Sequence, residues 1–267
     1  MKYFLMVFLL INQLVFANTK LMDIDKYFAN KDGCFILYDF NKGKVITKYN
    51  PKRCLMRVSP NSTFKIPLSL MAFDKKIINQ QTVFKWNGQK YDLEKWNMDQ
   101  TPQTWLKNSV LWVSREITPK LGLITIKSYL QKFNYGNKDF SGDKGKNNPL
   151  TQAWLSSSLK ISATEQLTFL NKMLKYKLPV SKKNAIYNTM NNMYLEDLAN
   201  GWQLYGKTGS GYKDGYRNGW FVGFIVKNNY KYIFVTNFSD KYSGKDNIAG
   251  GRIARDITEH ILLMDMK

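Results

Sequence analysis

Strand-like segments lie at both ends of this chain and helix-like segments fill its middle. Near the start, Gly33–Asp39 and Lys44–Tyr49 flank the turn signal Asn41-Lys42-Gly43 and predict a hairpin. Near the end, a strand over 202–208 precedes a second hairpin, formed by Gly219–Val226 and Lys231–Phe238. Because the two groups are far apart in sequence, we expect one antiparallel sheet built from both chain ends.

Between these groups, helical periodicity runs over 62–73 and 100–132, and a capping box at Ser162–Glu165 opens a further helix. Pro67 is expected to bend or loosen the first of these helices. A last helix is expected over 249–264. The pattern predicts an α+β fold in which helices flank the sheet and a mostly helical insertion separates its two halves.

The first 17 residues have the features of a secretory signal peptide. Lys2 gives a basic start, an apolar stretch runs from Tyr3 to Phe16, and Ala17 ends an acceptable cleavage site. The apolar stretch is short for a membrane span. We therefore expect an exported, periplasmic protein with a single catalytic domain over 18–267 and no stable membrane insertion after cleavage; an uncleaved anchor is the alternative.

The net charge of +20 allows an anionic partner such as nucleic acid or an envelope polymer. Most of the positive charge is Lys, however, and it is spread through the whole chain rather than gathered in an Arg-rich arm. Export makes nucleic acid a poor partner as well. A Lys-rich solvated surface is the favoured interpretation, and the sequence does not indicate an oligomeric state.

Two cysteines, Cys34 and Cys54, lie in an exported chain, where a disulfide is permitted. Sequence alone does not place their Cβ atoms, so one disulfide and two buried thiols remain equally open. Together with the single histidine, His260, they cannot supply a structural zinc site, and no metal is expected. A Ser-His-Asp hydrolase would depend on this one helical His, and no G-x-S-x-G motif accompanies it.

Ser62 and Lys65 form the pair that suggests chemistry. At positions i and i+3 a hydroxyl and an amine share one face of a helix. A serine needs a base to become a nucleophile, and a lysine serves as one only where its surroundings remove its charge. Each motif is weak alone, but S-x-x-K followed far downstream by Lys207-Thr208-Gly209 is the order found in penicillin-recognising serine enzymes.

Further motifs decide the branch of that group. The S-D-N motif of class A enzymes is absent from the sequence, and the run Asn108-Ser109-Val110-Leu111 stands between the two motifs instead. Tyr135-Gly136-Asn137 follows, and then W-L-x-x-S-L-K-I-S from Trp154. In this combination the chain resembles the class D β-lactamases, the oxacillinases, over nearly its whole mature length.

The resemblance implies a β-lactam hydrolase with an acyl-enzyme on Ser62. Lys65 would react with carbon dioxide or bicarbonate to form N6-carboxylysine, a general base, and the Trp154 indole N–H would anchor the new anion. Ser109 would relay a proton near the lactam nitrogen, with Lys207 beside it. No other cofactor is implied.

The same resemblance assigns the substrate-binding positions. Backbone N–H groups of Ser62 and Ser210 would form the oxyanion hole, and Gly209 would let the substrate approach the backbone. Thr208 and Arg252 would hold the substrate carboxylate.

The chain departs from the family pattern at one position: the third residue of the S-x-V motif is Leu111. This side chain would lie over the carboxylated lysine and alter water access. Two other activities share the motifs and serve as alternatives, a penicillin-binding sensor and a D-Ala-D-Ala peptidase, both of which acylate without efficient turnover.

Overall fold

The computed structural model describes residues 24–199, 201–242, 244 and 246–265 of the chain. The predicted signal peptide lies outside the described residues. Within the described part, no helix is both long and apolar enough to cross a membrane.

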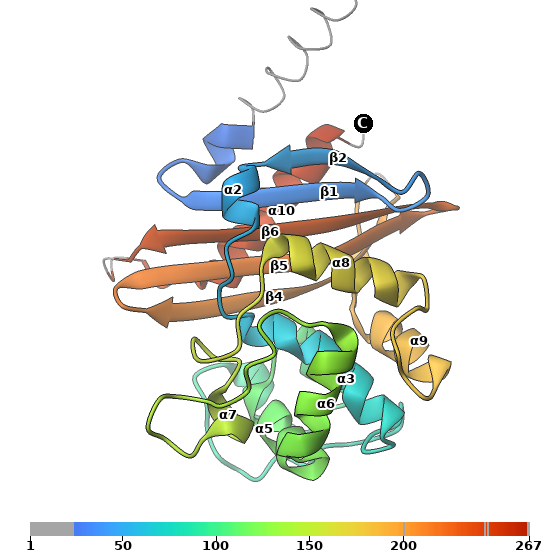
Figure 1. Cartoon of the computed structure of the whole chain (residues 1–267), viewed down its shortest axis with the longest axis vertical. Coiled ribbons are helices and arrows are strands. Elements are labelled where there is room, and N and C mark those ends of the chain that lie inside the picture. Colours follow the sequence, from blue (N-terminus) through green and yellow to red (C-terminus); the bar gives the residue numbers. More distant parts are fainter. Residues whose placement is uncertain (1–23, 200, 243, 245, 266–267) are drawn as a thin grey trace, which may run out of the picture.

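A single six-stranded antiparallel sheet joins the two ends of the chain, as predicted (Figure 1). Its spatial order is β2-β1-β6-β5-β4-β3. The strands are β1 (Asp32–Asp39), β2 (Lys44–Tyr49), β3 (Tyr194–Asp197), β4 (Gln203–Lys213), β5 (Tyr216–Lys227) and β6 (Tyr230–Lys241). The two halves meet where β1 pairs with β6, so that Cys34 lies opposite Asn237.

Both predicted hairpins form, and their turns use residues that tolerate positive φ. Gly43 closes the β1–β2 turn with a φ of 67°. Between Lys227 and Tyr230, which pair with one another, Asn228 has a φ of 54°. Asparagine is among the few residues other than glycine that adopt this conformation routinely, which suits a two-residue hairpin loop.

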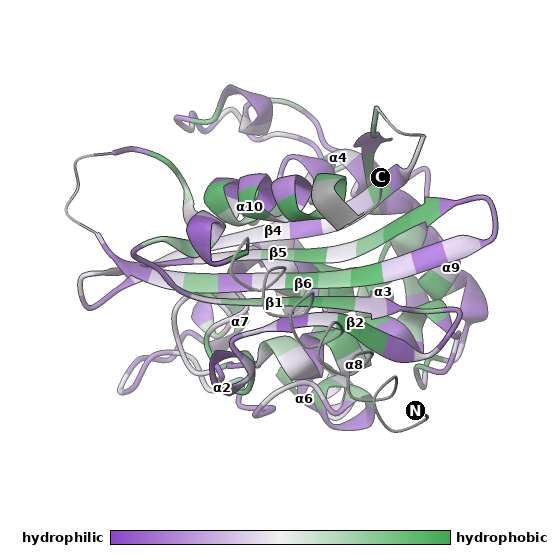
Figure 2. Cartoon of the chain, turned by 90° about the horizontal axis from the view of Figure 1, so that it is seen from above, coloured by the Kyte–Doolittle hydropathy of each residue, from purple (hydrophilic) through white to green (hydrophobic). Residues whose placement is uncertain are grey.

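Helices cover both faces of the sheet (Figure 2). The carboxy-terminal helix α10 packs on one face and α8 packs on the other, while helices of the insertion, including α5 and α6, lie beyond β4 in Figure 1. The helical segments are η1 (Lys26–Phe28), α2 (Pro51–Cys54), η2 (Asn61–Phe64), α3 (Lys65–Asp74), η3 (Glu94–Trp96), α4 (Pro102–Lys107), α5 (Leu111–Leu121), α6 (Leu123–Phe133), α7 (Pro149–Gln152), α8 (Ala163–Leu174), α9 (Lys183–Asn192) and α10 (Gly250–Asp265).

Alternation along the strands builds two separate cores. Phe35 and Leu37 of β1 join the core beneath α10, whereas Cys34 and Ile36 join the larger core beneath the insertion. This period of two is what a strand with both faces covered requires. Cys34 forms a disulfide with Cys54, at the end of α2, which resolves the alternatives left by the sequence.

The helix predicted over 62–73 starts as the 3₁₀ turn η2 and becomes the α-helix α3 at Lys65. Pro67 therefore lies in the first turn of α3, where a missing N–H is well tolerated. The capping box also forms, with the Ser162 hydroxyl accepting from the Glu165 N–H at the start of α8. Helix α9 and strand β3 were not predicted.

Candidate active site

The change from 3₁₀ to α-helix sets Ser62 beside Lys65. Lys65 Nζ lies 3.2 Å from Ser62 Oγ, within hydrogen-bond distance. The Lys65 side chain is completely buried beneath a partly exposed Ser62. Burial lowers the pKa of the Lys65 amine well below its usual value, and the charges of Lys207 and Arg115 lower it further. A neutral amine next to a serine hydroxyl is able to accept its proton.

Asn61 holds the nucleophile segment against the segment that carries Trp154. The Asn61 N–H donates to the Trp154 carbonyl at 2.9 Å, and the Ser156 N–H donates to Asn61 Oδ1 at 3.0 Å. Asn61 and Ser156 both have positive φ, 49° and 50°, as does Ser109 at 59°. Non-glycine residues in this region store strain and gather at functional sites. Asn61 was not among the site residues predicted from the sequence. An asparagine directly before the candidate nucleophile is the feature of the sequence that could have indicated it.

Trp154 packs against Phe64, the residue that precedes Lys65. Its indole is fully buried and stacks on Phe64, with ring centroids 5.5 Å apart, and on Phe140, at 5.9 Å. Its Nε1–H is buried without a hydrogen-bond partner among the described residues. A buried donor without a partner lowers the stability of the folded protein. This N–H is therefore suited to donate to an acceptor that is added to the site, such as a ligand or a modified side chain.

Lys207 and Ser109 form a second side-chain contact of the site. Lys207 Nζ donates to Ser109 Oγ at 2.9 Å and to the Thr208 carbonyl at 3.1 Å, and it lies 3.5 Å from Thr208 Oγ1. Burial lowers the pKa of Lys207 to about 7. This lysine can therefore donate or accept a proton near neutral pH, with Ser109 as its contact.

Strand β4 exposes one edge to the site because β3 pairs only with its first residues, Gln203 to Tyr205. The Gly206 N–H points to that edge, since it donates to the Met193 carbonyl. Backbone groups alternate between edges along a strand, so those of Thr208 and Ser210 point the same way. The Ser210 side chain is turned elsewhere, because its hydroxyl accepts from the Gly251 N–H at 2.8 Å.

Gly209 lets β4 approach the nucleophile segment. A Cβ at this position would lie 2.8 Å from the Pro60 carbonyl oxygen and 3.2 Å from Thr63 Cγ2. The N–H groups of Asn61 and Thr63, on either side of Ser62, donate to carbonyls of the protein. That of Ser62 lies in the first turn of the helical segment, where N–H groups lack intrahelical acceptors. It is available to a ligand bound along the edge of β4.

Arg252 and Leu111 lie further out. Arg252 is in the first turn of α10 with its side chain 74% exposed, and its Nε is 3.7 Å from an Asp256 carboxylate oxygen. Its link to the other residues runs through the neighbouring Gly251, so its role toward a substrate carboxylate stays a prediction. Leu111 is the first residue of α5 and lines a groove of about 430 Å³ with Trp96, Trp112 and Arg115 among others.

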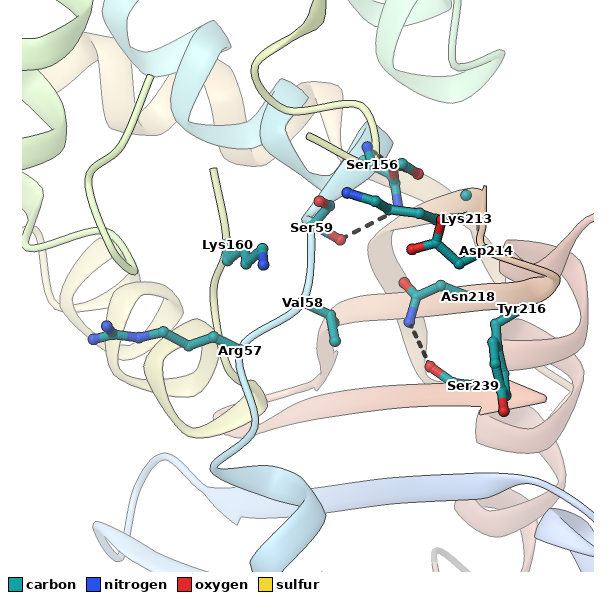
Figure 3. A pocket seen from close by; sticks show the side chains of 12 residues that line it. Arg57, Val58, Ser59, Ser156, Lys160, Lys213, Asp214, Tyr216, Asn218 and Ser239 are labelled. Carbon is teal, nitrogen blue, oxygen red and sulfur yellow. Dashed lines mark hydrogen bonds between the residues drawn. The ribbon is translucent and has the colours of Figure 1, made fainter. Parts of the chain in front are cut away.

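A second pocket, of about 280 Å³, adjoins the site on the side of Asn61 (Figure 3). Asn61, Ser156 and Gly211 line it where it meets the site, and Figure 3 shows Lys213 and Tyr216 contributed from the β4–β5 end. The nucleophile segment thus has open space on its flank. In the described ranges, no three His, Cys, Asp or Glu side chains gather closely enough to hold a metal ion.

Comparison with known proteins places these features in a family. Residues 33–260 match the family described as penicillin binding protein transpeptidase domain. The chain is 50% identical to beta-lactamase OXA-1 of Escherichia coli over 238 residues, covering 86% of each chain. It is 36% identical to the regulatory protein BlaR1 of Staphylococcus aureus, covering 85% of this chain but 38% of BlaR1. The solved class D beta-lactamase BAT-2 has a TM-score of 0.80 and 36% identity, covering 91% of this chain and 95% of BAT-2.

Proposed function

This chain belongs to the class D β-lactamases, enzymes that hydrolyse the β-lactam ring, and we propose that it does so through an acyl-enzyme on Ser62 with N-carboxylated Lys65 as the base. Resistance to penicillin-type antibiotics follows from that activity. The observation that carries this proposal is the buried Lys65 amine within hydrogen-bond distance of the Ser62 hydroxyl. The ring of the adjacent Phe64 stacks on Trp154, whose buried indole N–H lacks a partner among the described residues.

Carboxylation suits this surrounding for two reasons. Only a neutral amine attacks carbon dioxide, and burial favours the neutral form of Lys65 by lowering its pKa. The reaction forms an N–C bond and releases one proton, which leaves a carboxylate that needs hydrogen-bond donors. Trp154 Nε1–H is a donor that cannot accept, so it is suited to an anion. The carboxylate oxygens would extend farther from the Lys65 backbone than the amine nitrogen does, and one of them would act as the base.

Acylation then uses two pairs of residues, Ser62 with the base on Lys65 and Ser109 with Lys207. The Ser62 hydroxyl gives its proton to the base on Lys65 as Oγ attacks the lactam carbonyl carbon. The Ser62 and Ser210 N–H groups face the oxygen that becomes negative. The ring C–N bond breaks, and the nitrogen takes a proton from Ser109, which Lys207 replaces. Before the second half, the base on Lys65 passes the Ser62 proton to Lys207, which restores both groups. Water then attacks the ester carbonyl carbon and gives a proton to the base, and this proton moves to Ser62 Oγ as the Oγ–C bond breaks.

The substrate would lie along the open edge of β4. Thr208 and Arg252 are proposed to hold its carboxylate, and Leu111 to border the base. We also propose that residues 1–17 direct export to the periplasm and are removed there, leaving 18–267 as one catalytic domain.

The test is turnover of a chromogenic β-lactam by the purified mature chain, with and without bicarbonate, while intact mass follows the acyl-enzyme. Repeated turnover that bicarbonate enhances is the expected result, and Ser62→Ala should abolish both turnover and adduct. One stoichiometric adduct on Ser62 without turnover would contradict hydrolysis and favour the sensor activity, for which the similarity to BlaR1 is the relevant precedent.

A further inference from the structure

Arg217 is a buried arginine at the start of β5. Its side chain is 6% exposed, and it lies directly opposite Asp240 of β6 in the sheet. The two form a bidentate pair, in which Nε donates to Oδ1 at 3.0 Å and Nη2 donates to Oδ2 at 2.6 Å. Two parallel bonds to one carboxylate fix the plane of a guanidinium, so this cation has one defined orientation.

The same guanidinium also holds the connection between β6 and α10, which covers 242–249. Nη1 donates to the Asp246 carboxylate and, at 3.0 Å, to the Ile248 carbonyl. The Ile248 N–H in turn donates to Asp246 Oδ1 at 3.1 Å. The ring centroid of Tyr242 lies 5.2 Å from the guanidinium carbon. One buried cation therefore holds the connection near both of its ends.

The connection leads directly to a residue proposed to bind the substrate carboxylate. Helix α10 begins two residues after Ile248 and has Arg252 in its first turn. The backbone of Gly251 packs so closely on β4 that a Cβ there would lie 2.9 Å from Thr208 Cβ. Where Arg252 stands relative to Thr208 therefore depends on how the connection is held.

We propose that Arg217 is a positioning residue for substrate recognition, which fixes the start of α10 so that Arg252 binds the substrate carboxylate. This inference rests on the proposed function, in which Thr208 and Arg252 hold that carboxylate. The Arg252 side chain is 74% exposed, so its backbone is what determines where its charge can reach. A backbone that is held in advance lowers the entropic cost of binding, because fewer conformations are lost when the substrate arrives.

The experiment compares a chromogenic β-lactam that carries a free carboxylate with the methyl ester of the same compound. Esterification removes the charge that Arg252 is proposed to bind, so the ratio of kcat/KM for acid over ester reports carboxylate recognition. A change at the reacting atoms, such as a shift of the Ser210 N–H, affects both substrates alike and leaves this ratio unchanged. The ratio is measured for wild type, Arg217→Gln and Asp246→Ala, and for each variant combined with Arg252→Gln. Thermal melts report folding.

The two variants change the local charge in opposite directions. Arg217→Gln removes a positive charge, whereas Asp246→Ala removes a negative charge and would by charge alone favour an anionic substrate. The Asp246 side chain is 46% exposed, and its loss leaves the buried pair of Arg217 with Asp240 in place. Arg53→Gln is the matched control, because the Arg53 side chain is 2% exposed and pairs with Asp32 but belongs to α2, outside the connection.

The expected result is an acid-to-ester ratio about tenfold lower in both Arg217→Gln and Asp246→Ala, with Arg53→Gln equal to wild type. Adding either substitution to Arg252→Gln should lower the ratio no further, because the positioning acts through Arg252. If Arg217→Gln does not fold, Asp246→Ala carries the same test alone.

An unchanged ratio in a folded variant overturns the proposal, and so do ratios that move in opposite directions in the two variants, because that pattern is an effect of charge. An effect that persists fully in the Arg252→Gln background overturns it as well. A wild type that does not turn over the acid overturns the proposed hydrolysis, and this inference with it, which separates that failure from the others.

Discussion

Trp154→Phe removes a buried side-chain hydrogen-bond donor that has no partner among the described residues. The substitution keeps an aromatic ring against Phe64 and Phe140 but removes the Nε1–H. A hydrogen bond to a charged group stabilises by about 1.5–3 kcal/mol. If that bond forms only when Lys65 is carboxylated, its loss weakens the binding of carbon dioxide by about 10- to 100-fold, at 1.4 kcal/mol for each factor of ten.

The assay is a bicarbonate titration of steady-state turnover, together with the rate at which the acyl-enzyme decays by intact mass. At low bicarbonate the variant should accumulate acyl-enzyme, and high bicarbonate should restore part of the turnover. Trp105→Phe is the matched control, because Trp105 is equally buried but its Nε1–H already donates to Ser114 Oγ at 3.0 Å. A bicarbonate dependence of Trp154→Phe equal to that of wild type and of Trp105→Phe would refute the reasoning.

Three further predictions follow from burial and covalent constraint. Since the pKa of Lys207 falls from 10.5 to about 7 on folding, the unfolded chain binds more protons between these values, and the free energy of unfolding should rise with pH in this window. Relative to Lys207→Met, wild type should gain about 2 kcal/mol between pH 7 and pH 9 in denaturant unfolding; parallel pH profiles would contradict the burial argument. Replacing both Cys34 and Cys54 by Ala removes a cross-link over a sequence separation of 20 residues and should lower the free energy of unfolding by about 3 kcal/mol, whereas a reducing agent should leave this variant unchanged but destabilise wild type. Leu111→Val should change the deacylation rate or the bicarbonate dependence, since it alters the side chain that is proposed to border the base, and identical pre-steady-state kinetics for both forms would exclude that role.

Local signals in the sequence predicted the elements, and family motifs predicted the site. The apolar run Gly33–Asp39 and the turn signal Asn41-Lys42-Gly43 were enough for the first hairpin, and the Ser162–Glu165 capping box located the start of α8. Strand β3 has four residues and helix α9 has a polar sequence, so neither produces a periodic signal of useful length. Their formation depends on packing against β4 and α3.

Contacts between distant parts of the chain leave no local signal in the sequence. The Lys207–Ser109 contact joins residues 98 apart, and only the family resemblance predicted it. The disulfide stayed open because the distance between Cys34 and Cys54 depends on how α2 folds back on β1.

The pairing of β1 with β6 also sets when this protein is able to fold. Each residue of β1 pairs with a residue of β6, which is synthesised long after β1. Among the described strands, the other partner of β1 is the edge strand β2. Contacts so distant along the chain form slowly, because a long loop must close before any interaction compensates for it. A ribosome-bound or partly synthesised chain therefore lacks the strand that would complete its core. Such delay would suit the proposed export, because a secretion channel requires an extended polypeptide, and folding would then take place on the far side of the membrane, where Cys34 and Cys54 can be oxidised.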